Sequence, residues 1–234
     1  MLQLQLPLLN KMKRNTLLSL SASVMCLVIL TLIEQYVKPN YLIKSCLKLL
    51  LLMSPIILNA FLTGKSLTEI IRMKKLRSAR ILYFGMFRAY CCIIIIFLVF
   101  RNYIDLDQIR TNLMNKEQLT KDNCLYIFAY IILVNSFIEE AFFRGFIYYL
   151  FEAEEKRRTG IIVSAILFAL YHIGIVSNWF NPLIFALCII GLAGCGMILQ
   201  WISLKFGTLK ASWLIHGCAN LAINTIGVIM IFNL

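Results

Sequence analysis

Residues 138–145 read Ile-Glu-Glu-Ala-Phe-Phe-Arg-Gly, and they place three charged side chains within an apolar run that extends over about residues 124–150. A charged residue at the centre of a membrane helix costs roughly 2.5–3.5 kcal/mol on insertion scales. Glu139, Glu140 and Arg144 therefore need partners or a polar cavity. We read the rest of the chain as the scaffold that supplies this cavity.

The composition is that of an integral membrane protein. Hydrophobic residues make up 61% of the 234 residues, and the mean hydropathy is +0.82. The apolar residues fall in blocks close to the roughly 20 residues that a membrane span requires. These blocks are residues 17–33, 45–62, 81–100, 124–150, 161–176, 183–204 and 211–232. The pattern predicts an all-α polytopic transmembrane helical bundle of about seven spans, within a range of six to eight, and a single integral membrane domain over residues 1–234.

The basic residues lie mainly in short segments between the apolar blocks. The formal net charge is +12. This placement indicates topology signals and contacts with anionic lipid headgroups rather than a nucleic-acid surface. If the N-terminus is inside, 14 of the 23 basic residues lie inside and seven lie outside, while Arg88 and Arg144 fall within blocks. The outside set is Lys38, Lys44, Lys48, Arg101, Arg110, Lys116 and Lys121. We therefore expect a bacterial cytoplasmic membrane protein with its N-terminus inside and its C-terminus outside.

Both histidines of the chain fall in apolar blocks. His172 follows Phe168 by one helical turn, and His216 precedes Asn220 by one turn. An isolated intramembrane histidine is most simply read as a hydrogen-bonding group between helices. Here every histidine and both deep acids fall in three of the last four blocks, and this coincidence favours one shared polar site.

Helical spacing predicts how the charges of the opening stretch divide. Glu140 and Arg144 are four residues apart, so they share a helix face and form an ion pair that lowers the cost of burial. Glu139 is offset by about 100° and points toward the interior. A rise of 1.5 Å per residue puts Glu139, His172 and His216 roughly 16, 18 and 9 Å from the inner boundary. We expect one cavity that opens toward the cytoplasm.

Such a set of side chains is suited to hydrolysis. A carboxylate held away from bulk water is a stronger base, and beside a histidine it takes a proton from water. A second histidine and an asparagine amide donate hydrogen bonds to the oxyanion of a tetrahedral intermediate. Glu139, His172 and His216 also make a zinc ligand set with an open position for water, although the HExxH spacing is absent. Metal-held and glutamate-activated water both remain open at this point.

Three motifs carry a resemblance to a known family. The patterns EExxxR at residues 139–144, FxxxH at 168–172 and HxxxN at 216–220 follow one another on successive hydrophobic segments. In this order they resemble the CAAX protease and bacteriocin-processing family of intramembrane proteases, also called CPBP or Abi, which includes the Ras-converting CAAX prenyl endopeptidase. The resemblance covers about residues 124–225.

The resemblance implies a role for each residue of the three motifs. Glu139 and His172 activate the water, and His216 and Asn220 form the oxyanion hole. Glu140 and Arg144 orient the first motif. The prenyl-protein branch implies a glutamate-dependent reaction that requires no cofactor, whereas the family's usual description as metalloproteases keeps a zinc ion on Glu139, His172 and His216 as the alternative.

The expected activity is endopeptidase cleavage of a peptide or membrane-anchored protein near the cytoplasmic interface. The alternative is a non-proteolytic membrane partner, such as a bacteriocin-immunity or regulatory protein, that retains the site and acts by binding. A proton-coupled transporter is a third reading, since intramembrane Glu and His relay protons in transporters. The sequence disfavours it, because it shows neither an internal repeat nor paired helices broken by Gly or Pro.

Overall fold

A computed structural model describes residues 2–76, 80–115, 117–177 and 179–232, with side chains from residue 13 onward. Arg77, Lys116 and the side chain of Lys11, which entered the count of basic residues, lie outside this part of the chain. Seven described helical segments are long and apolar enough to cross a membrane, so the prediction of seven spans is confirmed. These segments are Lys13–Val37, Tyr41–Thr63, Arg80–Tyr103, Cys124–Glu152, Arg157–Val176, Pro182–Phe206 and Leu209–Phe232.

The described chain is helical and contains no strand. Its elements are α1 (Leu2–Leu32), η1 (Ile33–Val37), α2 (Tyr41–Thr63), α3 (Leu67–Ile70), α4 (Arg80–Phe100), η2 (Arg101–Tyr103), α5 (Leu106–Asn115), α6 (Cys124–Tyr130), η3 (Ile131–Asn135), α7 (Ser136–Glu140), η4 (Ala141–Ile147), α8 (Tyr148–Glu152), α9 (Arg157–Val176), α10 (Pro182–Phe206) and α11 (Leu209–Phe232). The elements from α6 to α8 form one span.

Local sequence signals set several helix ends. The side chains of Asn40 and Asn181 accept hydrogen bonds from backbone N–H groups three residues further on, which caps the starts of α2 and α10. Pro182 occupies the first turn of α10, where its missing N–H costs nothing. Gly64 and Gly207 end the same two helices at φ values of 70° and 67°, a left-handed conformation that favours glycine.

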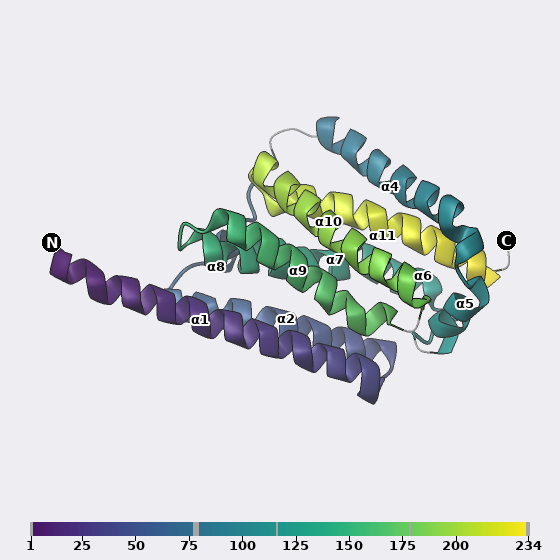
Figure 1. Cartoon of the computed structure of the whole chain (residues 1–234), viewed down its shortest axis with the longest axis horizontal. Helices are drawn as coiled ribbons and strands as arrows, with labels where there is room; N and C mark the ends of the chain where they lie inside the picture. Colours follow the sequence, from purple (N-terminus) through teal and green to yellow (C-terminus); the bar gives the residue numbers. More distant parts are fainter. Residues whose placement is uncertain (1, 77–79, 116, 178, 233–234) are drawn as a thin grey trace.

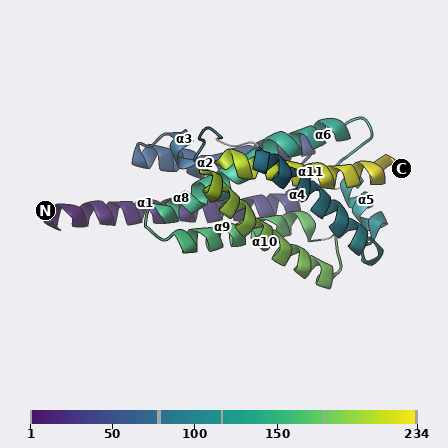
Figure 2. The same ribbon diagram turned by 90° about the horizontal axis from the view of Figure 1, so that it is seen from above.

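The helices lie side by side along the long axis of the molecule (Figure 1). α1 packs on α2 and α9, α9 packs on α10, and α11 packs on α10 and α4. The two ends of the chain lie at opposite ends of the bundle in both views (Figures 1 and 2), as an odd number of spans requires.

The core surrounds the span that carries the opening stretch. Phe142, Phe143 and Phe146 are fully buried there and pack with Leu52 and Ile56 of α2. The large apolar side chains of α4 and α10 are instead widely exposed, as expected for a surface in contact with lipid. The fold thus buries its charged residues at the centre and presents apolar side chains at the periphery.

Candidate active site

The span from Cys124 to Glu152 is not a uniform α-helix, because η3 and η4 are π-helical and flank the short helix α7. Neighbouring helices donate side-chain hydrogen bonds to its backbone. Ser164 Oγ donates to the Phe143 carbonyl at 2.7 Å, and Trp213 Nε1 donates to the Leu133 carbonyl at 3.1 Å. π-helical segments recur at functional sites. The two hydrogen bonds hold this span against α9 and α11.

Glu139 is 2% exposed, and three polar side chains surround its Oε1 atom. Asn135 Nδ2 donates to its Oε1 atom at 2.9 Å, and the Tyr171 hydroxyl donates to the same atom at 3.3 Å. Lys48 Nζ lies 3.7 Å from that oxygen. The carboxylate is therefore held by side chains from α2, η3 and α9.

Glu140 and Arg144 form the predicted ion pair, with Arg144 Nε 3.5 Å from Glu140 Oε1 and both side chains fully buried. The guanidinium makes no hydrogen bond within the described residues. Its Cζ atom lies 3.9 Å from the centre of the Phe168 ring, a cation–π contact. Arg144 thus joins the first motif to the phenylalanine of the second.

His216 lies between the two glutamates. Its Nδ1 atom is 2.9 Å from Glu140 Oε1, and its Nε2 atom is 3.7 Å from Glu139 Oε2. A carboxylate only accepts hydrogen bonds, so Nδ1 donates to Glu140. This bond leaves Nε2 directed toward Glu139.

His172 is oriented by its own helix. Its Nδ1 atom lies 2.7 Å from the Phe168 carbonyl, which only accepts, so Nδ1 carries the proton and Nε2 accepts in the neutral ring. Phe168, one helical turn earlier, packs on His172 with a ring-centre distance of 4.5 Å. The Tyr171 ring lies edge-on to His172 at a ring-centre distance of 5.0 Å, and its hydroxyl donates to Glu139.

A cavity of about 440 Å³ brings most of the predicted site residues together. Those that line it are Glu139, His172, His216 and Asn220. The remaining walls are largely apolar side chains of α4, α5 and α11. Glu140 and Arg144 are not among the lining residues and lie behind Glu139. The division between a cavity-lining and a supporting glutamate therefore follows the predicted helical offset.

The cavity lies at the opposite end of the bundle from the one expected. Its wall includes Glu34 near the end of α1, Ile104 after α4, Trp179 before α10 and Met230 near the end of α11. With the N-terminus inside, all four lie on the outer side. The expectation of a cavity that opens toward the cytoplasm is therefore inconsistent with the expected orientation. The rise per residue gives the depth of a residue in the membrane. It does not show at which end of the bundle the helices separate to form a cavity.

Three supporting residues were missing from the predicted site. Lys48 was assigned to an outer segment together with Lys44, but both lie within α2 and line the cavity, which corrects that assignment. Lysines one turn apart in an apolar block are a sequence signal of a polar site. Asn135 lies four residues before Glu139, and this spacing of one helical turn also indicates that the two side chains share a helix face. Tyr171 carries no signal except its place beside His172.

The described residues leave the zinc alternative considered above a prediction. They contain no group of three or more His, Cys, Asp or Glu side chains arranged to hold a metal ion. Both histidines bond through Nδ1, His216 to Glu140 and His172 to the Phe168 carbonyl, which leaves Nε2 of each ring available as a ligand. We derive no step through a metal.

The comparisons with known proteins agree with the motifs. Residues 121–222 match a family model described as type II CAAX prenyl endopeptidase Rce1-like. The matched segment runs from the start of the central span to α11 and contains all six predicted site residues. Neither the curated proteins nor the solved structures gave a match. The resemblance to a family of CAAX proteases, which are hydrolases, is confirmed over this segment.

Proposed function

We propose that this chain, whose residues 121–222 match the Rce1-like family, is an intramembrane endopeptidase that uses Glu139 to activate water. The observation that supports the proposal is the shared cavity, which is lined by Glu139, His172, His216 and Asn220. These residues come from α7, α9 and α11 and are up to 81 positions apart in the sequence. A purely structural role for them would not require a common void.

The first step of the proposed reaction is attack by water. Glu139 takes one proton from the water, and the hydroxide oxygen forms a bond to the carbonyl carbon of the scissile peptide. His172, with its free Nε2 atom, accepts a hydrogen bond from the same water and orients it. The second step is breakage of the C–N bond, when the proton held by Glu139 passes to the leaving amine.

The oxyanion formed in the first step needs donors. Asn220 carries two amide protons, and only one of them is used in its 3.4 Å bond to the Ile131 carbonyl. His216 donates to Glu140 through Nδ1, so Nε2 carries a proton only when the ring is doubly protonated. The oxyanion role of His216 therefore requires the imidazolium form, and the two neighbouring glutamates supply its counter-charge.

The proposed substrate is a peptide or membrane-anchored protein. The family acts on membrane-anchored proteins, and the apolar cavity walls suit a chain that enters from the bilayer. The test compares peptides from membranes of cells that carry wild-type protein or the Glu139→Ala variant. A product should be present with the wild-type protein and be lost with the variant, with both proteins at equal abundance.

A second outcome separates proteolysis from binding. If the Glu139→Ala variant retains the biological phenotype and the same peptide pattern, the chain acts as a non-proteolytic partner and the proposal is wrong. Metal dependence is tested separately by treating purified active protein with a chelator. We expect full activity after chelation, and recovery of a lost activity by added zinc would contradict the metal-free mechanism.

A further inference from the structure

The buried network around Glu139 contains a cation from outside the family-matched segment. Lys48 lies on α2, its side chain is 16% exposed, and its ammonium lies inside the bundle. A lysine in this position costs free energy unless its charge is used.

The contacts of Lys48 all lead to Glu139. Its Nζ atom donates to Asn135 Oδ1 at 2.9 Å, and the amide of the same asparagine donates to Glu139 Oε1 at 2.9 Å. The ammonium lies 3.7 Å from that oxygen and 5.2 Å from the centre of the Tyr171 ring. Tyr171 in turn donates its hydroxyl to Glu139. Lys48 thus contacts the carboxylate and both of its hydrogen-bond donors.

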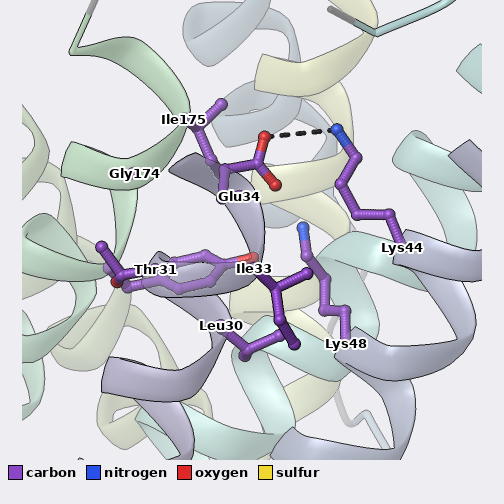
Figure 3. Close-up of a pocket in the computed structure, with 9 residues that line it drawn as sticks. Leu30, Thr31, Ile33, Glu34, Lys44, Lys48, Gly174 and Ile175 are labelled. Atoms are coloured by element: carbon purple, nitrogen blue, oxygen red, sulfur yellow. Dashed lines mark hydrogen bonds and ion pairs between the residues drawn. The ribbon is translucent and has the colours of Figure 1, made fainter. Parts of the chain in front are cut away.

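Lys44 provides an internal comparison. It lies one turn earlier on the same helix and lines the same cavity, but it pairs with Glu34 at 3.2 Å and with Glu117. Figure 3 shows both lysines extending from α2, with the ion pair drawn between Lys44 and Glu34. The two lysines therefore interact with different glutamates.

We propose that Lys48 is a positioning residue for the hydrolysis: its ammonium keeps Glu139 ionised and, through Asn135, aims one carboxylate oxygen so that the other faces His216 and the cavity. The inference rests on the proposed function, in which Glu139 is the base. Lys48 itself does not touch the substrate in this role. A matched effect on Lys44 is not expected, because its charge is already shared by two other glutamates.

The kinetic test uses purified full-length protein and the peptide substrate found in the membrane comparison. The Lys48→Met variant keeps the length of the side chain but loses the charge, and kcat should fall by about 100-fold because the base is misplaced. KM should stay nearly unchanged. The Lys48→Arg variant should recover most of kcat, and Lys44→Met should lower kcat much less than Lys48→Met does.

Three results would overturn the inference. An increase in KM at unchanged kcat would make Lys48 a substrate-binding residue. Equal losses for Lys48→Met and Lys48→Arg would show that the charge is not what matters. An equal loss of kcat for Lys44→Met would show a general effect of removing a buried cation from α2.

A stability test works even if the chain cleaves nothing, so it separates this inference from the proposed function. The Glu139→Gln variant leaves Lys48 without its counter-charge, and its Tm in detergent should fall. Adding Lys48→Met to this variant should restore part of the lost Tm, because the unpaired charge is removed. Additive losses in the double variant would show that Lys48 and Glu139 are not coupled.

Discussion

Asn220 and Asn224 lie one turn apart on α11 and both line the cavity. Each amide donates to a backbone carbonyl of the central span, Asn220 to Ile131 at 3.4 Å and Asn224 to Phe128 at 3.3 Å. Their structural contacts are thus equivalent. Only Asn220 lies within one turn of His216, so only Asn220 is expected to reach the oxyanion.

The Asn220→Ala variant should therefore lower kcat by about 100- to 1,000-fold, the usual effect of removing one oxyanion donor. The Asn224→Ala variant should keep kcat. Both should lose about 1 kcal/mol of stability, since each loses one hydrogen bond to the backbone. Steady-state kinetics and thermal unfolding of the two purified variants check this prediction, and equal kcat losses would contradict it.

Arg144 supports a second prediction about a single side chain. Its removal leaves the fully buried Glu140 without the guanidinium that pairs with it. The Arg144→Met variant should lose about 3–5 kcal/mol of stability, which is typical of breaking a buried ion pair. Thermal unfolding in detergent measures the loss. The Arg88→Met variant is the control, because Arg88 is an exposed arginine of α4, and an equal loss there would argue against a specific effect.

The sequence indicated the six motif residues because they are rare polar interruptions of apolar blocks, and because Glu140 with Arg144 and His216 with Asn220 are each one helical turn apart. It did not indicate Lys48 as a partner of Glu139, because the 91 positions between them carry no information on how α2 packs. The sequence indicated Asn135 only through its spacing of four residues from Glu139. Residue identity and periodicity predict which side chains share a helix face, whereas contacts between helices depend on packing that a single sequence does not contain.

For whole helices, the central span shows the same limit of prediction from a single sequence. Its extent was predicted closely, as residues 124–150 against Cys124–Glu152 in the structure. Its π-helical segments were not, because an almost continuously apolar run has no periodicity from which a local change of pitch is visible. In the segment between the third and the central span, Ile109 and Leu113 are four residues apart among polar residues, and this segment forms the short helix α5 with Ile109 buried.

Small residues gather at positions 191–196 of α10, a pattern that favours close helix packing, and the structure shows such packing at Gly196. A Cβ atom there would lie 3.0 Å from Ala165 Cα, whereas Gly191 has no neighbour within 4 Å of such an atom. The tightest glycine contact is instead at Gly145 in η4, where an added Cβ would lie 2.8 Å from Ile71 Cα. Gly145 therefore determines how closely the segment after α3 approaches the central span.

A matched pair of substitutions tests this contact. The Gly145→Ala variant should lose about 1–3 kcal/mol of stability, because the backbone of Ile71 must move to relieve the overlap. The Gly191→Ala variant should be neutral or slightly stabilising, since its new methyl group meets open space. Thermal unfolding in one detergent compares them. Equal stabilities of the two variants would show that the segment after α3 moves without loss of stability.

The whole bundle separates its basic loops from its cavity. Lys44 and Lys48 line the cavity near the outer end of α2, and with these two included seven outer basic residues face 14 inner ones. This asymmetry favours the orientation with the N-terminus inside. We therefore expect the cavity to open on the non-cytoplasmic side, and cleavage near the cytoplasmic interface is no longer the expected geometry.

Thiol labelling in intact cells tests this orientation. In a variant without the eight native cysteines, Trp179→Cys at the cavity should react with a membrane-impermeant maleimide added from outside. Lys156→Cys, at the opposite end of the bundle, should react only after the cells are broken. The reverse pattern would place the cavity on the cytoplasmic side and the N-terminus outside.

The depth of Glu139 has an electrical consequence. It lies near the middle of a 29-residue span, at the inner end of the cavity. A charge that moves from the outer surface to this point crosses about half of the membrane voltage, which is worth roughly 1 kcal/mol per 100 mV. In an energised cell with a negative interior, substrates with a positive charge beside the scissile bond should bind more tightly, and this preference should disappear when the membrane is depolarised.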